Sequence, residues 1–165
     1  MGKKAKIQKT NAIRLLEKNA VSFQVHTFPW SEDHLSAKDA MEKLSVPKEQ
    51  LFKTLVTVGD KTGVVIAVIP GTSELDLKAL AKASGNKKID MLHMNDLLAT
   101  TGYIRGGCSP IGMKKDFPTY LSILAEDMES IIVSAGKRGM QVELTPSDLK
   151  SITNGVFAEI EAVNP

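Results

Sequence analysis

A run of six consecutive apolar residues, at positions 64–69, constrains the fold more than any other stretch of this chain. Such a run predicts a strand that is buried on both faces and therefore lies in the middle of its sheet. Residues 51–58 are also rich in strand-forming side chains, and the sequence GDKTG at 59–63 predicts a tight turn between the two segments. We therefore expect the chain to fold around a central β-hairpin.

Apolar periodicity and capping residues predict short helices and strands in an irregular order. Helices are expected over residues 11–19 and 76–84, and further helices are expected to begin at Ser36, Asn95 and Thr145. Further strands are expected over residues 23–28, 131–134, 140–144 and 156–160. Because strands and helices do not alternate regularly, we expect an α+β domain with a mixed, strongly curved, barrel-like sheet flanked by short helices, and not a Rossmann sheet.

The charge balance and the cysteine content set loose limits on the function. The 21 Lys and Arg residues and 19 Asp and Glu residues give a net charge of +2, which neither requires nor excludes a nucleic-acid partner. A lone cysteine cannot form an intrachain disulfide, and the longest apolar run is too short to cross a bilayer. We therefore expect a cytoplasmic protein with no membrane contact.

The lysine-rich beginning of the chain differs in composition from the rest. We expect residues 1–10 to form a flexible basic terminus, and an RNA-binding arm is the alternative. No linker, repeat or low-complexity segment divides the remainder of the sequence. Residues 11–165 are therefore expected to form one domain, which is long enough to bury a core.

A glycine-rich segment resembles a nucleotide phosphate loop in its spacing alone. Gly107 and Gly112 are separated as in that loop, but Met113 and Lys114 occupy the positions that the loop reserves for Lys and for Ser or Thr. The hydroxyl that would hold magnesium is therefore missing. This mismatch argues against a nucleoside triphosphatase.

Cys108 and Ser134 are candidate nucleophiles on sequence grounds. A reactive Cys108 would need a nearby cation or base to lower the pKa of its thiol, whereas a small buried side chain is the commoner role of a lone cysteine. Ser134 and Lys137 match the S-x-x-K hydrolase pattern, but Gly136 and Gly139 discourage the helix that this pattern requires. The three histidines show no ligand spacing, so we expect neither a metal nor another cofactor.

Two glycine-rich turns that also carry cations remain as positive signals, at residues 106–115 and 134–139. Glycine lets a ligand approach backbone N–H groups closely, and such groups bind anions and carbonyl oxygens. Lys53 adds a cation within an otherwise apolar strand segment. This lysine would lie either on the solvated face of an edge strand or in a binding pocket.

Taken in order, four segments of the chain resemble the YbaK/EbsC family of Cys-tRNA(Pro) deacylases, which is related to the editing domain of bacterial prolyl-tRNA synthetases. They are FKTLV at 52–56, LDLKALA at 75–81, TGY at 101–103 with GGxSPxG at 106–112, and SAGKRG at 134–139. The similarity extends from about residue 11 to residue 160. It implies a YbaK-like fold and trans-editing, the hydrolytic release of a wrongly attached amino acid from the 3′ end of tRNA. It also implies that no metal or protein nucleophile takes part, and that the thiol of the substrate cysteine attacks its own ester carbonyl.

The resemblance also implies roles for individual residues. Lys53 matches the key lysine of the family and would position the tRNA 3′ end or the ester through its charge. The turn at 106–112 would surround the ester carbonyl, and the turn at 134–139 would form the facing wall, with Lys137 and Arg138 placed for phosphate contacts. The residues implied to bind the substrate are Phe28, Thr54, Gly106, Gly107, Ser109, Pro110, Gly112, Ser134, Gly136, Lys137, Arg138 and Gly139.

The partners implied are the acceptor end of a mischarged tRNA and prolyl-tRNA synthetase, with Cys-tRNA(Cys) as a further substrate. The chain departs from the family at three positions. Phe28 stands near a position where some members carry a tyrosine, Cys108 replaces the usual aliphatic residue, and Gln141 stands where some members have an acid. These departures leave open a preference for another small amino acid, such as alanine. A non-catalytic module that binds the tRNA acceptor end or a synthetase is the alternative function, because the weak net charge suits it.

Overall fold

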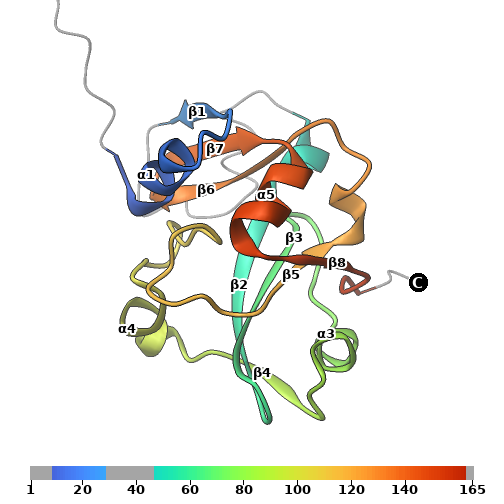
Figure 1. Ribbon diagram of the computed structural model, residues 1–165. Helices are drawn as coiled ribbons and strands as arrows, with labels where there is room; N and C mark the ends of the chain where they lie inside the picture. The colour runs from blue at the N-terminus through green and yellow to red at the C-terminus, as the bar shows by residue number, and fades with distance from the viewer. Residues whose placement is uncertain (1–8, 29–46, 163–165) are drawn as a thin grey trace, which may run out of the picture.

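The computed structural model describes residues 9–28 and 47–162, which form two β-sheets and several short helices (Figure 1). A three-stranded sheet has the order β1–β7–β6, with bounds Gln24–Thr27, Met140–Leu144 and Ile131–Lys137. A five-stranded sheet has the order β4–β2–β3–β5–β8, with bounds Ile89–Met91, Phe52–Gly59, Gly63–Pro70, Thr119–Ser122 and Val156–Ala158. Both parallel and antiparallel pairs occur in the larger sheet, which confirms the predicted α+β class with mixed strands.

The predicted central hairpin is confirmed in position and register. Strands β2 and β3 pair antiparallel from Phe52 opposite Pro70 to Gly59 opposite Gly63, and β3 lies between β2 and β5. Alternate side chains of β3 enter two different cores, because Ile66 and Val68 belong to one cluster and Val65, Ala67 and Ile69 to another. Burial on both faces therefore explains the uninterrupted apolar run.

Three of the expected helices are confirmed and have local caps. They are α1 (Asn11–Lys18), α3 (Leu77–Ser84) and α5 (Pro146–Thr153). The side chains of Thr10, Asp76 and Thr145 accept hydrogen bonds from the first turns of these helices. Gly85 ends α3 in the left-handed conformation with φ of 79°, as expected of a glycine cap.

The expected cap at Asn95 is wrong. The chain forms a 3₁₀ turn, Met94–Asp96, before α4 (Leu97–Thr101), and the side chain of His93 caps that turn by accepting from the N–H of Asn95. Two further 3₁₀ turns are Lys48–Gln50 and Ile123–Ala125. The helix expected to begin at Ser36 lies outside the described residues.

We expected one strongly curved sheet, and the strands of the described residues form two sheets. An isolated bridge joins the two sheets. Leu51, directly before β2, pairs with Ile132 of β6 in a parallel bridge. One core lies between the three-stranded sheet, α1, α5 and one face of the five-stranded sheet, and the other lies between the opposite face of the five-stranded sheet and α3. In Figure 1 α3 lies on the opposite side of the β2–β3 hairpin from α4. The bridge therefore places the start of β2 against β6.

Candidate functional site

Lys53 lies where the two sheets meet, and the strand register defines its neighbours. In a parallel bridge the paired residues direct their side chains to the same face, and residues two positions further along each strand do so again. Because Leu51 pairs with Ile132, Lys53 on β2 and Ser134 on β6 share one face. Two motifs that are far apart in the sequence are thereby brought together.

The same face continues across β7 and β1. Gln141 lies opposite Ser134 on β7, and His26 lies opposite Gln141 on β1. Phe28 follows two residues after His26, and its N–H donates to the carbonyl of Gly139 at 2.9 Å. We call the surface formed by Phe28, His26, Lys53, Ser134 and Gln141 the junction face.

Gln141 presents an unsatisfied acceptor within the junction face. Its Oε1 atom is buried and makes no hydrogen bond with the described residues. The neighbouring carboxylate of Glu143, in contrast, accepts from the Ser130 hydroxyl and lies 2.8 Å from Nε2 of His26. The Ser130 hydrogen bond and then the His26 contact hold the pKa of Glu143 below its usual value. The Glu143 carboxylate is thus satisfied, whereas no group of the described residues donates to the carbonyl oxygen of Gln141.

The two glycine-rich turns lie against each other. A Cβ atom added to Gly107 would come 3.0 Å from the backbone nitrogen of Arg138 and 3.1 Å from the carbonyl carbon of Lys137. The Nε–H of Arg138 donates to the carbonyl of Arg105 at 2.8 Å. Glycine at 107 is therefore required for the close approach of the two backbones.

The backbone donors of these turns are only partly available. The N–H of Gly107 donates to Ile104 at 3.0 Å, and the N–H of Gly136 donates to Oγ of Ser134 at 3.2 Å. Among the described residues, the N–H of Gly106 makes no hydrogen bond, and Gly106 is exposed. Because Oγ of Ser134 accepts, its hydroxyl proton can still be donated to a ligand.

Ser109 and Thr54 do not belong to the junction face. Ser109 is fully buried, and its Oγ accepts from the N–H of Ile111 at 3.2 Å within the turn. Thr54 follows Lys53 directly in a regular strand, so its side chain points to the opposite face of β2. Its Oγ1 is buried and has no hydrogen-bond partner among the described residues. A role in substrate binding was expected for these two side chains. It stays a prediction, because neither side chain lies on the junction face with Lys53.

Cys108 is held as a neutral thiol. Burial raises the pKa of this side chain to about 11, although a hydrogen bond with Thr101 acts in the opposite direction. The partly buried side chain packs against the core next to the three-stranded sheet. At neutral pH almost none of it is thiolate, which argues against a protein nucleophile at this position.

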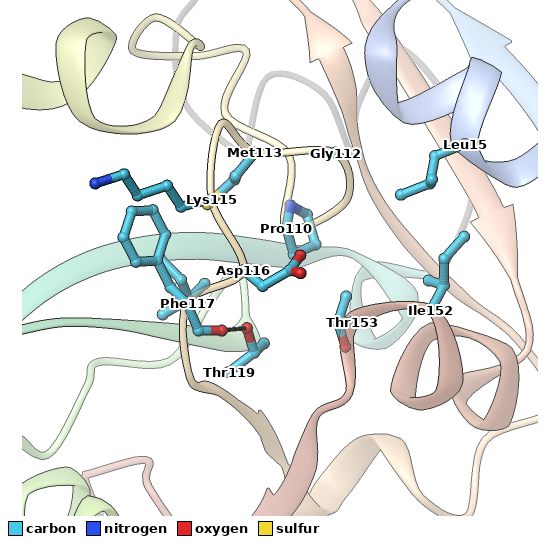
Figure 2. A pocket seen from close by; sticks show the side chains of 11 residues that line it. Leu15, Pro110, Gly112, Met113, Lys115, Asp116, Phe117, Thr119, Ile152 and Thr153 are labelled. Carbon is cyan, nitrogen blue, oxygen red and sulfur yellow. Dashed lines mark hydrogen bonds between the residues drawn. The ribbon is translucent and has the colours of Figure 1, made fainter. Parts of the chain in front are cut away.

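A cavity of about 210 Å³ lies between α1, α5 and the chain segment 110–119 (Figure 2). Pro110 and Gly112 are the residues of the expected site that line it, and neither Lys53 nor Ser134 does so. Gly112 also packs closely on α1, because a Cβ atom there would come 3.0 Å from the carbonyl carbon of Asn11. The cavity and the junction face are therefore separate features.

Comparison with known proteins decides the family. The family described as "Aminoacyl-tRNA editing domain" matches residues 31–152. The chain belongs to this family. An Enterococcus faecalis protein described as "Putative Cys-tRNA(Pro)/Cys-tRNA(Cys) deacylase EbsC" is 65% identical to this editing domain over 160 residues, with 97% of this chain and 98% of that protein covered. A proline–tRNA ligase of Shouchella clausii is 31% identical over 102 residues, which are 61% of this chain and 18% of the ligase.

Solved structures confirm the fold of the editing domain. One described as "a putative trans-editing enzyme for prolyl tRNA synthetase" superposes with a TM-score of 0.82 at 23% identity, covering 93% of this chain and 96% of that one. Together with the family match, this likeness confirms the resemblance to the YbaK/EbsC family and the predicted fold class. Within the described residues no helix has the length and hydrophobicity to cross a membrane.

Sequence reasoning missed two polar members of the junction face of the editing domain. Gln141 was noted as a departure but not as a site residue, and His26 was considered only as one of the histidines that could approach Cys108. Both lie in strands whose side chains alternate between core and junction face, because Val25 and Val142 enter the core. Alternation could have found the face, but only the pairing register shows that it continues to Lys53.

Proposed function

We propose that this editing domain is a trans-editing deacylase that releases cysteine from Cys-tRNA(Pro), and also from Cys-tRNA(Cys). The observation that carries the proposal is the Enterococcus faecalis relative described by both substrates, which matches this chain from end to end at 65% identity. At that identity and coverage, the similarity extends over the whole domain and is not limited to one motif. Residues 11–165 are accordingly proposed to act as one editing domain.

A second site for hydrolysis has a physical reason. A binding pocket that distinguishes two amino acids of similar size gains only about 1–3 kcal/mol from a small apolar difference. Proline and cysteine differ little in volume, so an activating site for proline admits cysteine at a measurable rate. Hydrolysis of the wrong ester at a separate site then supplies the missing discrimination.

The nucleophile in this proposal belongs to the substrate. The thiol of the esterified cysteine bonds to its own carbonyl carbon, the bond from that carbon to the ribose oxygen breaks, and the ribose oxygen takes the proton. Water then opens the cyclic thioester to free cysteine. The neutral, buried Cys108 agrees with this assignment, because the protein offers no thiolate there.

Residues of the junction face would position the ester. The ammonium group of Lys53 stabilises the negative charge that develops on the carbonyl oxygen. Within the described residues, the hydroxyl proton of Ser134 and the N–H of Gly106 make no hydrogen bond, and both would donate to the same region. Gln141 Oε1, which lacks a donor, would accept a hydrogen bond from the α-ammonium group of the substrate.

Cations on the two turns would hold the tRNA. The backbones of Lys137 and Arg138 lie beside Gly107, and their side chains would carry positive charge to the neighbourhood proposed for the ester. Contacts of this kind bind phosphates irrespective of base sequence. A prolyl-tRNA synthetase would then supply the mischarged tRNA as a partner in the cytoplasm.

The deciding experiment measures release of tRNA from one tRNA(Pro) that carries cysteine, alanine, serine or proline. We expect release of cysteine to be fastest and proline to be spared. Lys53→Ala should abolish release while the circular dichroism spectrum stays unchanged, and Lys61→Ala, a change at an exposed turn lysine, should have no effect. Tight binding without release would favour the non-catalytic module, and fastest release of alanine would overturn the assignment to cysteine.

A further inference from the structure

The cavity of about 210 Å³ lies on the face of the five-stranded sheet opposite to Lys53. Ile66 of β3 forms part of its lining and belongs to the same core cluster as Phe52 and Val56 of β2. Those two side chains alternate with Lys53 along β2 and therefore point away from it. A ligand in this cavity would not occupy the junction face.

The walls of the cavity combine apolar side chains with polar and charged groups. Leu15 of α1 and Ile152 of α5 point into it from one side, and Pro110 and Phe117 border it from the loop (Figure 2). A volume of about 210 Å³ corresponds to on the order of seven water molecules at about 30 Å³ each. The space is therefore suited to a short carbon chain with one polar head and is too small for a nucleotide.

Two hydroxyl groups at the cavity can act only as hydrogen-bond acceptors for a ligand. The hydroxyl of Thr119 donates to the carbonyl of Phe117 at 3.0 Å, and that of Thr153 donates to the carbonyl of Leu149 at 2.7 Å. With their protons engaged, these hydroxyl oxygens have only lone pairs left for a ligand. A ligand that matches them must bring its own donors.

Asp116 adds a negative charge to this set. Its exposed carboxylate points into the space between Pro110 and Thr153, and Lys115, which also lines the cavity, directs its ammonium group away from that carboxylate (Figure 2). Among the described residues, none forms an ion pair or hydrogen bond with Asp116. The cavity therefore combines a carboxylate, two hydroxyl acceptors and an aliphatic wall.

We propose that this cavity is a binding site for a small organic cation, a guanidinium or primary ammonium group on a short aliphatic stem. The head group donates to the Asp116 carboxylate and to Oγ1 of Thr153, and the stem packs between Leu15 and Ile152. Such a cation exists free, as an alkylamine or alkylguanidine, and as the side chain of a peptide. The free cation is the ligand whose size matches the volume of the cavity. This site does not depend on the deacylase assignment.

Nuclear magnetic resonance titration with n-butylguanidinium tests the proposal, and n-butylurea is the neutral probe of the same shape. We expect saturable shifts of the amide signals of Leu15, Phe117 and Ile152, and binding of the urea at least about tenfold weaker. Equal affinity of the two probes, or shifts centred on Lys53, would overturn the proposal. Binding of an arginine-containing peptide but not of n-butylguanidinium would overturn it as well.

Two variants and a matched control assign the contacts. Asp116→Asn should weaken n-butylguanidinium binding about tenfold, because a hydrogen bond to a charged group is lost. Asp127→Asn makes the same change at an exposed carboxylate that does not line the cavity, and it should leave the affinity within about twofold. Ile152→Trp fills the cavity and should abolish binding, and unaltered binding in either this variant or Asp116→Asn rejects the site.

Discussion

The ring of Tyr103 lies against Gly136 so closely that a Cβ atom on Gly136 would come 2.7 Å from Cε1 of the ring. Tyr103 is buried, and its hydroxyl donates to the carbonyl of Ile111 at 2.7 Å. One aromatic side chain thus contacts the turn at 134–139 and is hydrogen-bonded to the other glycine-rich turn, at 106–115. This contact fixes the distance between the two turns that the proposed site requires.

Gly136→Ala should lower both stability and activity. Gly136 has a φ of 95°, so alanine there is strained by about 1–2 kcal/mol, and its Cβ also displaces the Tyr103 ring. With about 1–3 kcal/mol for the steric overlap, we expect a loss of about 3 kcal/mol in the free energy of unfolding, measured by urea denaturation.

Gly85→Ala is the matched control for this change. Gly85 has a φ of 79°, but a Cβ atom there would meet nothing within 4 Å. We expect Gly85→Ala to cost only the backbone strain of about 1–2 kcal/mol and to leave deacylation intact. Equal losses in the two variants would show that the contact with Tyr103 does not contribute.

The thiol of Cys108 should react slowly with alkylating reagents in the folded protein. Its pKa of about 11, raised by burial from the ordinary value of 9.0, lowers the thiolate fraction near pH 8 by about a hundredfold. Alkylation by iodoacetamide should therefore be at least about a hundredfold slower in the native protein than in urea, and Cys108→Ala should retain deacylation. A folded but inactive Cys108→Ala variant would restore the protein nucleophile and reject the substrate-assisted mechanism.

Glu143 should contribute to stability above its ordinary pKa and lose that contribution in acid. Hydrogen bonds from Ser130 and then His26 lower its pKa in the folded state, so the unfolded chain takes up the proton first as the pH falls. The contribution is therefore complete above the ordinary value of 4.5 and disappears as the pH drops through the lower folded value. Glu143→Gln should lose about 1 kcal/mol at pH 7 and match the parent protein in strong acid.

Glu126→Gln is the control, because Glu126 is exposed and has no hydrogen bond or ion pair through its carboxylate within the described residues. Chemical denaturation from pH 2 to 7 compares the three proteins. A constant difference between Glu143→Gln and the parent across this range would show that the stabilisation does not depend on ionisation.

Features determined by neighbouring residues could be predicted from the sequence. The β2–β3 hairpin follows from an apolar run and a glycine turn, and α3 follows from a cap at each end, Asp76 and Gly85. Strands β4 and β5 were missed because they have only three and four residues, too few to show a period of their own. Each is a strand because a longer neighbour, β2 or β3, offers its backbone hydrogen bonds.

The composition of the site could be predicted only in part, because it too depends on pairing between strands that are distant in the sequence. The resemblance supplied Lys53 and Ser134, but their shared face depends on a single bridge between Leu51 and Ile132. Gln141 joins that face through its pairing with Ser134, which no local pattern contains. Thr54 was assigned from the same family motif as Lys53, although adjacent residues of a strand point to opposite faces.

Gln141→Met separates a structural role of Gln141 from a functional one. Methionine keeps the length of the side chain and removes the buried oxygen that has no donor among the described residues. Removing an unsatisfied buried acceptor should leave stability unchanged or raise it by up to about 1 kcal/mol. If that oxygen binds the α-ammonium group of the substrate, kcat/KM for Cys-tRNA(Pro) should nevertheless fall about tenfold or more, because a hydrogen bond to a charged group is lost. Gln24→Met, an exposed change on the neighbouring strand β1, should alter neither quantity. A stability loss in Gln141→Met with unchanged kcat/KM would mean that Gln141 supports the sheet and that the ammonium group binds elsewhere on the junction face.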